Sequence, residues 1–510
     1  MRTTALTLLA ALLGILGASC GDELTEPDGM EASESQPALV DELNRRVPEL
    51  LFEYRVPGVA VALLEAGVVE HQLVYGLADS EAQRPVTADT GFNIGSISKL
   101  FAAWGVMRLV EQGRIDLDAS VEQYLTRWYL PESEFDSDGV TIRRLLSHTA
   151  GLTLEGYPGF EPGAPLPTLE ESLRGATNGA GDVRLTMEPG KQWHYSGGGY
   201  TVLQLMIEEV TGEPFADYMQ RNVLAPLGMG HSSFDVSNEI LKASSEAHGI
   251  LGKVIGGPRF TAMAAAGLET TVADLGRFAV ANMGNEGGVQ AGHPVLRSET
   301  LREMQAAAPA TDGSYGLGYA LYSFEDGFRT LGHDGANTGW YAQLHLLPES
   351  GRGIIVLTNG SNGWVLCEDI VCQWRKHVSP DADQVACQKP PYPLLSIIAE
   401  EESVAAALEH FAKLKSERSE EYKFPPAALH YFGYDLLRDD RVAEAIEAFK
   451  LNFQLFPEES AAAGSLGEAH LIAGNKDLAI KYLEKSLELN PESSKRAMML
   501  EQARAMDLDQ

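Results

Sequence analysis

The chain has 510 residues, of which 44% are hydrophobic, and a formal net charge of −33. At about 100–200 residues per domain, this length predicts several domains, and the apolar content is typical of a globular protein. The large negative charge argues against nucleic acid as a partner, because a phosphate-binding protein needs a basic surface.

The first 38 residues are typical of an export signal followed by a tether. Arg2 precedes an apolar run at 5–16 and the small residues 17–19, which end directly at Cys20. The run is too short to span a bilayer as a helix. It resembles a bacterial lipoprotein signal, except that Gly17 stands where a large apolar residue is usual. The resemblance implies a lipid anchor on Cys20 and a periplasmic or cell-surface location; the alternative is cleavage and release. Residues 21–38 are interpreted as an acidic tether.

The remaining cysteines are Cys367, Cys372 and Cys387. Export implies an oxidising compartment, so either one disulfide with one free thiol or no disulfide is expected. The sequence has neither a Cys-x-x-Cys pair nor a His-Glu-x-x-His motif, so we expect no metal and no cofactor.

The first chemical motif is Ser96-x-x-Lys99. It follows a helical pattern at 40–52 and two predicted strands, 59–64 and 68–75, joined by a turn at 65–67. The motif leads into a predicted helix that continues through 100–112 and ends at Gly113. On a helix, positions i and i+3 lie about 5–6 Å apart on one face, so the Lys99 amine can reach the Ser96 hydroxyl. Ser96 is therefore the candidate nucleophile; the alternative is an ordinary solvated helix face.

Residues 116–260 predict a mainly helical insertion. His148, in the stretch 145–152, is interpreted as a structural residue of a helix-to-loop turn. Tyr195 precedes a glycine-rich loop and a predicted helix at 202–210. A phenol beside a cationic amine can lose its proton and act as a base; the alternative is an aromatic ring that packs in the loop. His194, on the same loop, is an alternative base, but we interpret it as a residue that packs around the site.

The next part returns to strands. We expect strands at 317–322 and 328–331, a hairpin of 341–347 with 353–358, and a closing helix at 364–377. Between them lies His333-Asp334-Gly335-Ala336. A glycine-flanked strand edge beside a nucleophile can offer a backbone N–H to an oxyanion, and His333 suits a wall that faces the substrate.

These three motifs, in this order, resemble the serine beta-lactamase and penicillin-binding-protein superfamily, in the branch of class C beta-lactamases, D-amino-acid peptidases and esterases. Further segments support the resemblance, which covers residues 39–378: 145–152, 224–229 and 265–275. It implies an α/β fold of the beta-lactamase type, with an antiparallel sheet flanked by helices and a mainly helical subdomain.

The resemblance also implies roles for individual residues. Ser96 would be the acylated nucleophile, and Lys99 and Tyr195 would share its proton. The N–H groups of Ser96 and Ala336 would form the oxyanion hole. The substrate would be bordered by the third motif, His333, Asp334 and Gly335.

Two departures from the family's pattern affect the expected substrate. The usual Tyr-x-Asn is Tyr195-Ser196-Gly197 here, and the usual Lys-Thr-Gly is the motif at 333–335. We therefore expect hydrolysis of an ester or of a small peptide or amide, such as one with a D-amino acid. The alternatives are a beta-lactamase or D-Ala-D-Ala carboxypeptidase, and an inactive module that binds peptidoglycan or peptides.

The end of the chain changes character. Residues 379–394 contain four prolines and predict a linker, and residues 395–510 predict helices without strands. Residue types recur 34 positions apart, as in Gly433 and Gly467 or Pro457 and Pro491. This period resembles tetratricopeptide repeats, with units at 429–457 and 463–491. The repeats would dock a peptide or protein partner, or form a structural extension that packs on the hydrolase.

Overall fold

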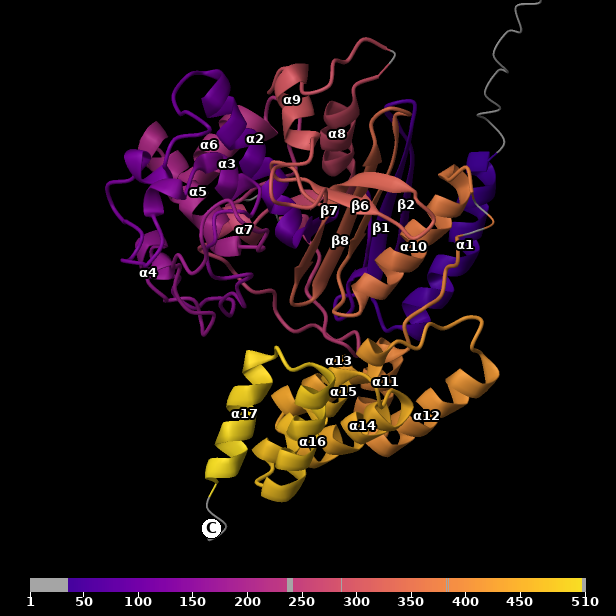
Figure 1. Ribbon diagram of the computed structural model, residues 1–510. Helices are drawn as coiled ribbons and strands as arrows, with labels where there is room; N and C mark the ends of the chain where they lie inside the picture. Colours follow the sequence, from indigo (N-terminus) through magenta and orange to yellow (C-terminus); the bar gives the residue numbers. More distant parts are fainter. Residues whose placement is uncertain (1–34, 236–241, 286, 382, 384, 507–510) are drawn as a thin grey trace, which may run out of the picture.

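The computed structural model describes residues 35–235, 242–285, 287–381, 383 and 385–506. Figure 1 shows an α/β body and, beside it, an all-helical body formed by the end of the chain. Cys20 and the predicted signal lie outside the described residues. Helix α1 (Ser35–Glu53) begins within the segment interpreted as the tether. Within the described ranges, no helix is both long enough and apolar enough to cross a membrane.

The α/β body is organised around a seven-stranded antiparallel sheet with the strand order β3-β2-β1-β9-β8-β7-β6. The strands are β1 (Gly58–Glu65), β2 (Val68–Asp79), β3 (Arg84–Pro85), β6 (Ala320–Ser323), β7 (Arg329–Asn337), β8 (Trp340–Leu347) and β9 (Arg352–Thr358). Both predicted hairpins, β1–β2 and β8–β9, are confirmed. The expected strand at 317–322 begins only at Ala320. Gly318 has φ +92°, far from the values of about −120° to −140° that are typical of strands.

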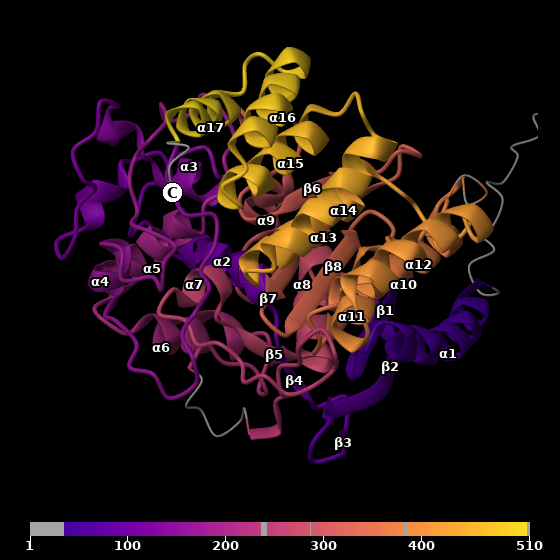
Figure 2. The same cartoon turned by 90° about the horizontal axis from the view of Figure 1, so that it is seen from below.

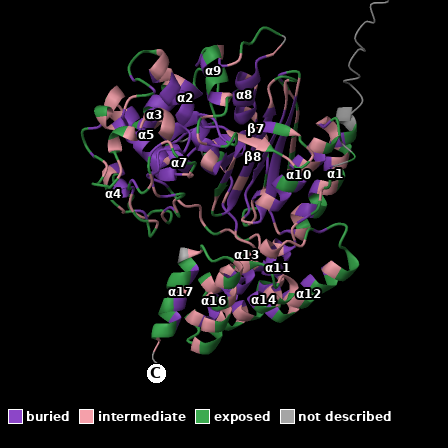
Figure 3. Ribbon diagram, in the orientation of Figure 1, coloured by how far each residue is buried: buried purple, intermediate pink, exposed green. Residues whose placement is uncertain are grey.

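Alternating side chains of the sheet build two hydrophobic cores. Val59, Val61 and Leu63 of β1 pack with α1 and α10 (Gly363–Val378). The intervening residues 60, 62 and 64 join the larger core with α2 (Ser98–Glu111) and α8 (Val272–Met283). Strands β1, β8 and β9 are buried along most of their length, and Figure 3 shows this middle part of the sheet as mainly buried. Each fully buried Val or Leu side chain contributes about 1.5–3 kcal/mol. Strand β1 therefore anchors β9, the middle strand of the sheet, which in turn pairs with β8. The predicted α/β fold, with its antiparallel sheet flanked by helices, is confirmed.

A mainly helical subdomain is inserted between β4 (Gly91–Asn93) and β6. Its helices are α2 (Ser98–Glu111), α3 (Ile142–Leu146), α4 (Leu169–Leu173), α5 (Gly197–Thr211), α6 (Phe215–Met219) and α7 (Met263–Ala266), with a π-helical turn at Gln220–Leu224. Strand β5 (Glu269–Thr271) pairs with β4. After α8 comes α9 (Ser298–Gln305).

Helix α5 begins five residues before the predicted start at 202. The Ser196 hydroxyl caps it by accepting a hydrogen bond from the Gly199 N–H at 2.9 Å. A Cβ atom at Gly198 would lie 2.7 Å from the Thr153 carbonyl oxygen. The glycines at 197–199 therefore form the first turn of a helix whose backbone approaches the neighbouring loop closely. Because glycine has a low helix propensity, the sequence did not predict that the helix begins there.

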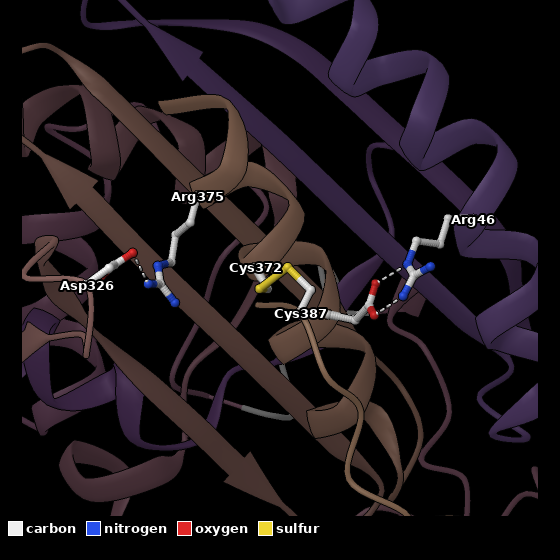
Figure 4. The surroundings of a disulfide bond; sticks show 6 residues. Arg46, Asp326, Cys372, Arg375 and Cys387 are labelled. Atoms are coloured by element: carbon white, nitrogen blue, oxygen red, sulfur yellow. Dashed lines mark hydrogen bonds and ion pairs between the residues drawn. A yellow bond between two sulfur atoms is a disulfide. The ribbon is translucent and has the colours of Figure 1, made fainter. Parts of the chain in front are cut away.

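A disulfide joins Cys372 of α10 to Cys387, and Cys367 is a buried free thiol. This outcome confirms one of the two expected arrangements. The bond closes a loop of 15 residues, and a cross-link of this span stabilises a fold by about 3 kcal/mol through the unfolded chain. It also ties the segment that leads to the helical body to α10. Figure 4 shows the disulfide between two arginines, Arg46 and Arg375, each of which is engaged in an ion pair.

The helical body confirms the expectation of helices without strands among the residues described after 391. It consists of α11 (Tyr392–Glu401), α12 (Val404–Glu417), α13 (Pro426–Arg438), α14 (Val442–Leu455), α15 (Ser460–Ile472), α16 (Lys476–Leu489) and α17 (Ser494–Ala505). Helix α11 begins at Tyr392, two residues before the predicted end of the linker at 394.

The 34-residue period has a structural counterpart in this body. Helices α13 and α15 start at 426 and 460, and α14 and α16 start at 442 and 476. A Cβ atom on Gly433 would lie 2.4 Å from the Phe449 ring, and one on Gly467 would lie 2.8 Å from Leu483. Equivalent glycines thus allow close helix packing in both units. The arrangement is consistent with tetratricopeptide-like repeats, and membership of that repeat family stays a prediction.

The helical body rests on the α/β body near the end of α1. Tyr422 is buried in the same core as Tyr54 and Trp374. The Tyr422 hydroxyl donates to Glu53 at 2.6 Å, and Lys389 pairs with the same carboxylate at 2.9 Å. Figure 2 shows α11 and α12 close to α10 and α1.

Candidate active site

Ser96 lies in a short 3₁₀ turn, Gly95–Ile97, directly before α2. Gly95 has φ +50°, and its N–H donates to the Asn93 side chain at 3.0 Å. Ser96 is partly exposed, whereas the residues on both sides of it are buried. The turn therefore presents one hydroxyl at the surface of a rigid core.

Lys99 lies one helical turn after Ser96 and is only 2% exposed. Its Nζ atom donates to the Ser96 Oγ atom at 2.9 Å and to the Ala265 carbonyl oxygen at 2.7 Å. Burial lowers the pKa of the Lys99 amine to about 7, since a buried charge loses its hydration. At neutral pH a large fraction of Lys99 is therefore uncharged and can accept the Ser96 proton.

Tyr195 reaches the same hydroxyl from the residue before the cap of α5. Its phenol is hydrogen-bonded to Ser96, and the Lys99 Nζ atom lies 4.9 Å from the centre of its ring. Burial raises the pKa of Tyr195 above its usual value, and the hydrogen bond from Ser96 offsets this only in part. The expectation that a nearby cation lowers the pKa of Tyr195 is wrong, because desolvation is the larger effect.

The two neighbouring histidines support the loop that carries Tyr195. His148 adopts φ +58°, and its Nδ1 atom accepts a hydrogen bond from the Ser196 N–H at 3.0 Å. Its ring lies 4.2 Å from that of Tyr195, and burial holds its pKa well below the usual value. His194 donates its backbone N–H to the His148 carbonyl at 2.8 Å. The interpretation of His148 as a structural residue agrees with these contacts.

The free edge of β7 faces the Ser96 turn. Strand β6 pairs with β7 only as far as Gly332, so the residues that follow are unpaired on this side. A Cβ atom on Gly95 would lie 2.5 Å from the Ala336 amide nitrogen, and one on Gly335 would lie 1.8 Å from the Ile94 carbonyl oxygen. The glycines thus bring the amides of Ser96 and Ala336 to one junction, as an oxyanion hole requires.

Asn93 and Asn337 fix this junction, and the sequence analysis missed both. The Asn337 amide nitrogen donates to the Asn93 side chain at 2.5 Å and to the Ala266 carbonyl at 3.0 Å. The two residues are 244 positions apart, so no local pattern could connect them.

His333 faces the site and is uncharged. Its Nδ1 atom donates to the Asp334 carbonyl oxygen at 2.5 Å, and its Nε2 atom lies 2.9 Å from the Tyr315 hydroxyl. Because a carbonyl only accepts, Nε2 is left to accept from Tyr315. Burial, with a contribution from the charge of Lys99, lowers the pKa of His333 to about 3.

Asp334 was expected to border the substrate, but the structure does not bring its side chain to Ser96. Successive residues of a strand point to opposite faces, so Asp334 lies on the face of the sheet that is covered by α10, close to Tyr322 and Gln343.

Gly197 occupies the position of the usual asparagine. A Cβ atom there would lie 3.0 Å from the Glu155 carbonyl oxygen and 3.5 Å from the Tyr157 ring. The Tyr157 hydroxyl lies 2.7 Å from that of Thr201. Tyr157, from an irregular loop, therefore lies beside the position that the asparagine side chain occupies in the usual motif. No sequence pattern predicts this neighbour.

Residues 43–369 match the family model described as Beta-lactamase. The chain is 31% identical to penicillin-binding protein 4 of Amycolatopsis lactamdurans, over 62% of this chain and 84% of that protein. It is 33% identical to esterase EstB of Burkholderia gladioli, over 39% of this chain and 52% of that protein. Among solved structures it resembles the octameric penicillin-binding protein homologue from Pyrococcus abyssi, with a TM-score of 0.58 and 25% identity over 71% of this chain and 82% of that one.

Proposed function

The chain belongs to the beta-lactamase family of serine hydrolases, and we propose that it hydrolyses an ester, or a small peptide or amide such as one with a D-amino acid, through an acyl-enzyme on Ser96. The observation that carries this proposal is the buried Lys99 amine, 2.9 Å from the Ser96 hydroxyl and with a pKa of about 7. A serine nucleophile needs a base of this kind, because its own hydroxyl keeps its proton at neutral pH.

The geometry supports the following sequence of steps. Uncharged Lys99 takes the Ser96 proton while Oγ forms a bond to the substrate carbonyl carbon, and the N–H groups of Ser96 and Ala336 stabilise the oxyanion. The phenol of Tyr195, which is still protonated, donates to the leaving oxygen or nitrogen as its bond to the acyl carbon breaks, and Lys99 returns a proton to Tyr195. Water then attacks the acyl carbon and gives a proton to the Lys99–Tyr195 pair. The pair passes this proton to the Ser96 Oγ atom as its bond to the acyl carbon breaks, which releases the acid and restores Ser96.

The third motif favours neutral substrates over substrates with a carboxylate. Lys-Thr-Gly supplies a fixed positive charge, whereas His333 is held uncharged by burial. Gly197 also removes an amide that would contact the substrate. A carboxylate-bearing lactam or a terminal D-Ala-D-Ala would therefore lose a charge-assisted hydrogen bond, and an ester without a carboxylate would not.

We expect p-nitrophenyl butyrate to be hydrolysed with a kcat/KM about 10–100-fold above that of nitrocefin or of a D-Ala-D-Ala peptide, since a hydrogen bond to a charged group contributes about 1.5–3 kcal/mol. His333→Lys is expected to lower the ratio of the two kcat/KM values, because it restores the positive charge of the usual Lys-Thr-Gly motif. Steady-state kinetics on the same substrate panel provide the measurement. Faster turnover of nitrocefin or of the peptide by the unmodified enzyme would favour the lactamase or carboxypeptidase alternative instead.

The proposed location is the periplasm or the cell surface of a bacterium, with the protein held at a membrane by a lipid on Cys20. The sequence of residues 5–20 supports it. Mass spectrometry of the mature protein should find its N-terminus at Cys20 with a lipid mass; an unmodified N-terminus after cleavage would support release.

The helical body is proposed to serve as a docking surface for a peptide or protein as well as a support for the hydrolase. Its buried contacts around Tyr422 account for the supporting role. Limited proteolysis checks the docking role. A fragment that begins at residue 392 and is folded by itself would support a docking surface. An unfolded fragment would support the alternative, a structural extension that only packs on the hydrolase.

A further inference from the structure

Four ring side chains form a closed cluster beside Ser96, which we call the four-ring cluster: Trp193, Tyr195, His333 and Tyr315. The distances between ring centres are 6.2 Å from Trp193 to Tyr195, 6.1 Å from Tyr195 to His333, 6.0 Å from His333 to Tyr315, and 6.1 Å from Tyr315 back to Trp193. All four distances are typical of ring contacts in proteins. Because the Tyr195 phenol is hydrogen-bonded to Ser96, the cluster adjoins the nucleophile.

Trp193 is the exposed member of the four-ring cluster. It is 41% exposed, whereas Tyr315 and His333 are only 3% and 5% exposed. The buried ring of His148 packs against the cluster from the inside, with its centre 4.2 Å from that of Tyr195 and 6.3 Å from that of Trp193. Single exposed aromatic residues are common on protein surfaces, but this indole is in contact with the ring whose hydroxyl reaches the nucleophile. Its open surface is therefore available to a group bound at Ser96.

The segment that carries Trp193 is held in place by hydrogen bonds to His148. The N–H of His194, the next residue, donates to the His148 carbonyl oxygen at 2.8 Å. The Ser196 N–H donates to the His148 Nδ1 atom at 3.0 Å. A side chain on a fixed backbone loses less conformational freedom when a ligand packs on it than one on a mobile loop. Trp193 is therefore a pre-formed contact surface.

The position of Tyr195 determines which part of the substrate meets Trp193. In the reaction proposed above, the Tyr195 phenol donates its proton to the leaving oxygen or nitrogen, whereas the oxyanion lies at the amides of Ser96 and Ala336. The leaving group therefore extends along Tyr195, and Trp193 is the exposed ring in contact with Tyr195. This step rests on the proposed function, because it uses the direction of that proton transfer.

The rings of the cluster are uncharged at neutral pH. Burial lowers the pKa of His333 to about 3, so its imidazole is neutral. Burial raises the pKa of Tyr195 and that of Tyr315 above the usual value, so both phenols keep their protons. A charged leaving group would lose hydration beside these rings without gaining a partner of opposite sign. A flat apolar group buries its surface there and gains ring contacts.

We propose that Trp193 determines specificity by binding the leaving group, and that the enzyme acts on esters whose alcohol carries an aromatic ring. The indole packs on the ring of the alcohol and thereby places the ester oxygen at the Tyr195 phenol. The bond between this oxygen and the acyl carbon breaks as the oxygen takes the phenol proton, and the aromatic alcohol leaves. Trp193 itself forms no bond and moves no proton.

Initial-rate kinetics on three butyrate esters test this proposal. The alcohols are benzyl alcohol, cyclohexylmethanol, which has a ring of similar size without aromatic character, and ethanol, which has no ring. Since the acyl group is the same in all three, differences in kcat/KM report on the leaving group. We expect kcat/KM for benzyl butyrate to exceed that for ethyl butyrate about tenfold or more, with cyclohexylmethyl butyrate in between.

Trp193→Ala should lower the benzyl-to-ethyl ratio of kcat/KM about tenfold, and Trp193→Phe should keep most of it, because phenylalanine retains an aromatic face. If Trp193 only supported Tyr195, its loss would slow the hydrolysis of all three esters equally and leave this ratio unchanged. Phe52→Ala is the matched control and should keep the ratio. Phe52 is exposed and lies on α1, which packs in a different core from α2.

Two results would overturn the proposal. One is a similar kcat/KM for all three esters in the unmodified chain; the other is the same benzyl-to-ethyl ratio in the unmodified chain and Trp193→Ala. In either case, loss of activity in Ser96→Ala would show that the proposed hydrolase function still holds. If the unmodified chain hydrolyses none of the esters, or Ser96→Ala hydrolyses them equally fast, the proposed function is wrong and this assignment is wrong with it.

Thermal unfolding of each variant checks its fold. If Trp193→Ala does not fold, Trp193→Leu takes its place, because leucine keeps an apolar side chain without a ring. The same fall in the benzyl-to-ethyl ratio is then expected, and an unchanged ratio overturns the proposal.

Discussion

Replacing Ser96 with alanine is expected to lower kcat on p-nitrophenyl butyrate by about 10³-fold or more, because removal of a serine nucleophile elsewhere has cost about 10⁶-fold. The side chain is partly exposed and is hydrogen-bonded only within the site, so the variant should fold normally. The loss of activity should therefore appear in kcat, because the variant lacks the Oγ atom that forms the covalent bond to the substrate.

Ser350→Ala provides the matched control. Ser350 lies at an exposed turn between β8 and β9, and its replacement should leave kcat unchanged. Thermal unfolding of both variants separates a chemical effect from loss of fold. If Ser96→Ala keeps more than about a tenth of the kcat, a loss too small for removal of a nucleophile, then Ser96 is not the nucleophile.

The second large effect concerns Lys99. We expect kcat/KM to rise with pH through about 7 and to level off above it, because only the uncharged amine can accept the Ser96 proton and burial lowers the pKa of Lys99 to about 7. Lys99→Met should lose about 10²–10⁴-fold in activity, as expected for removal of a general base, and should also lose this rising limb. The control Lys191→Met, on an exposed side chain, should keep both the activity and the pH profile.

Lys99 is also expected to reduce the stability of the fold near neutral pH. Its folded pKa of about 7 lies below the value of about 10.4 in an unfolded chain, so between these values the unfolded state binds more protons and stability rises with pH. Lys99→Met should therefore have a higher Tm than the unmodified chain at pH 7, with a smaller difference at pH 10. A pH profile that rises near 10 instead, with no gain in Tm for Lys99→Met, would contradict the lowered pKa.

Local patterns were sufficient for the framework of the molecule. Short apolar runs on either side of a glycine-containing turn predicted β1 and β2, and the spacing of Ser96 and Lys99 predicted their contact, which the structure has at 2.9 Å. These features depend on residues only a few positions apart. Strand patterns and helix spacing are set by such close neighbours, so the sequence is enough to predict them.

Features that depend on distant packing could not be predicted in this way. The pKa of Tyr195 is governed by how deeply the fold buries it, which the motif does not encode. Asp334 stands beside His333 in the sequence, yet the pleat of β7 turns the two side chains to opposite faces, and only the sheet shows which face meets Ser96. The contact of Asn337 with Asn93 joins two distant segments and was missed for the same reason.

The central claim is that Ser96 forms the covalent intermediate, and labelling with a fluorophosphonate tests it most directly. Intact mass spectrometry followed by peptide mapping should find one phosphonyl group per chain, on Ser96, and none on Ser96→Ala. Equal labelling of the unmodified chain and Ser96→Ala, or an adduct on another serine, would contradict the account.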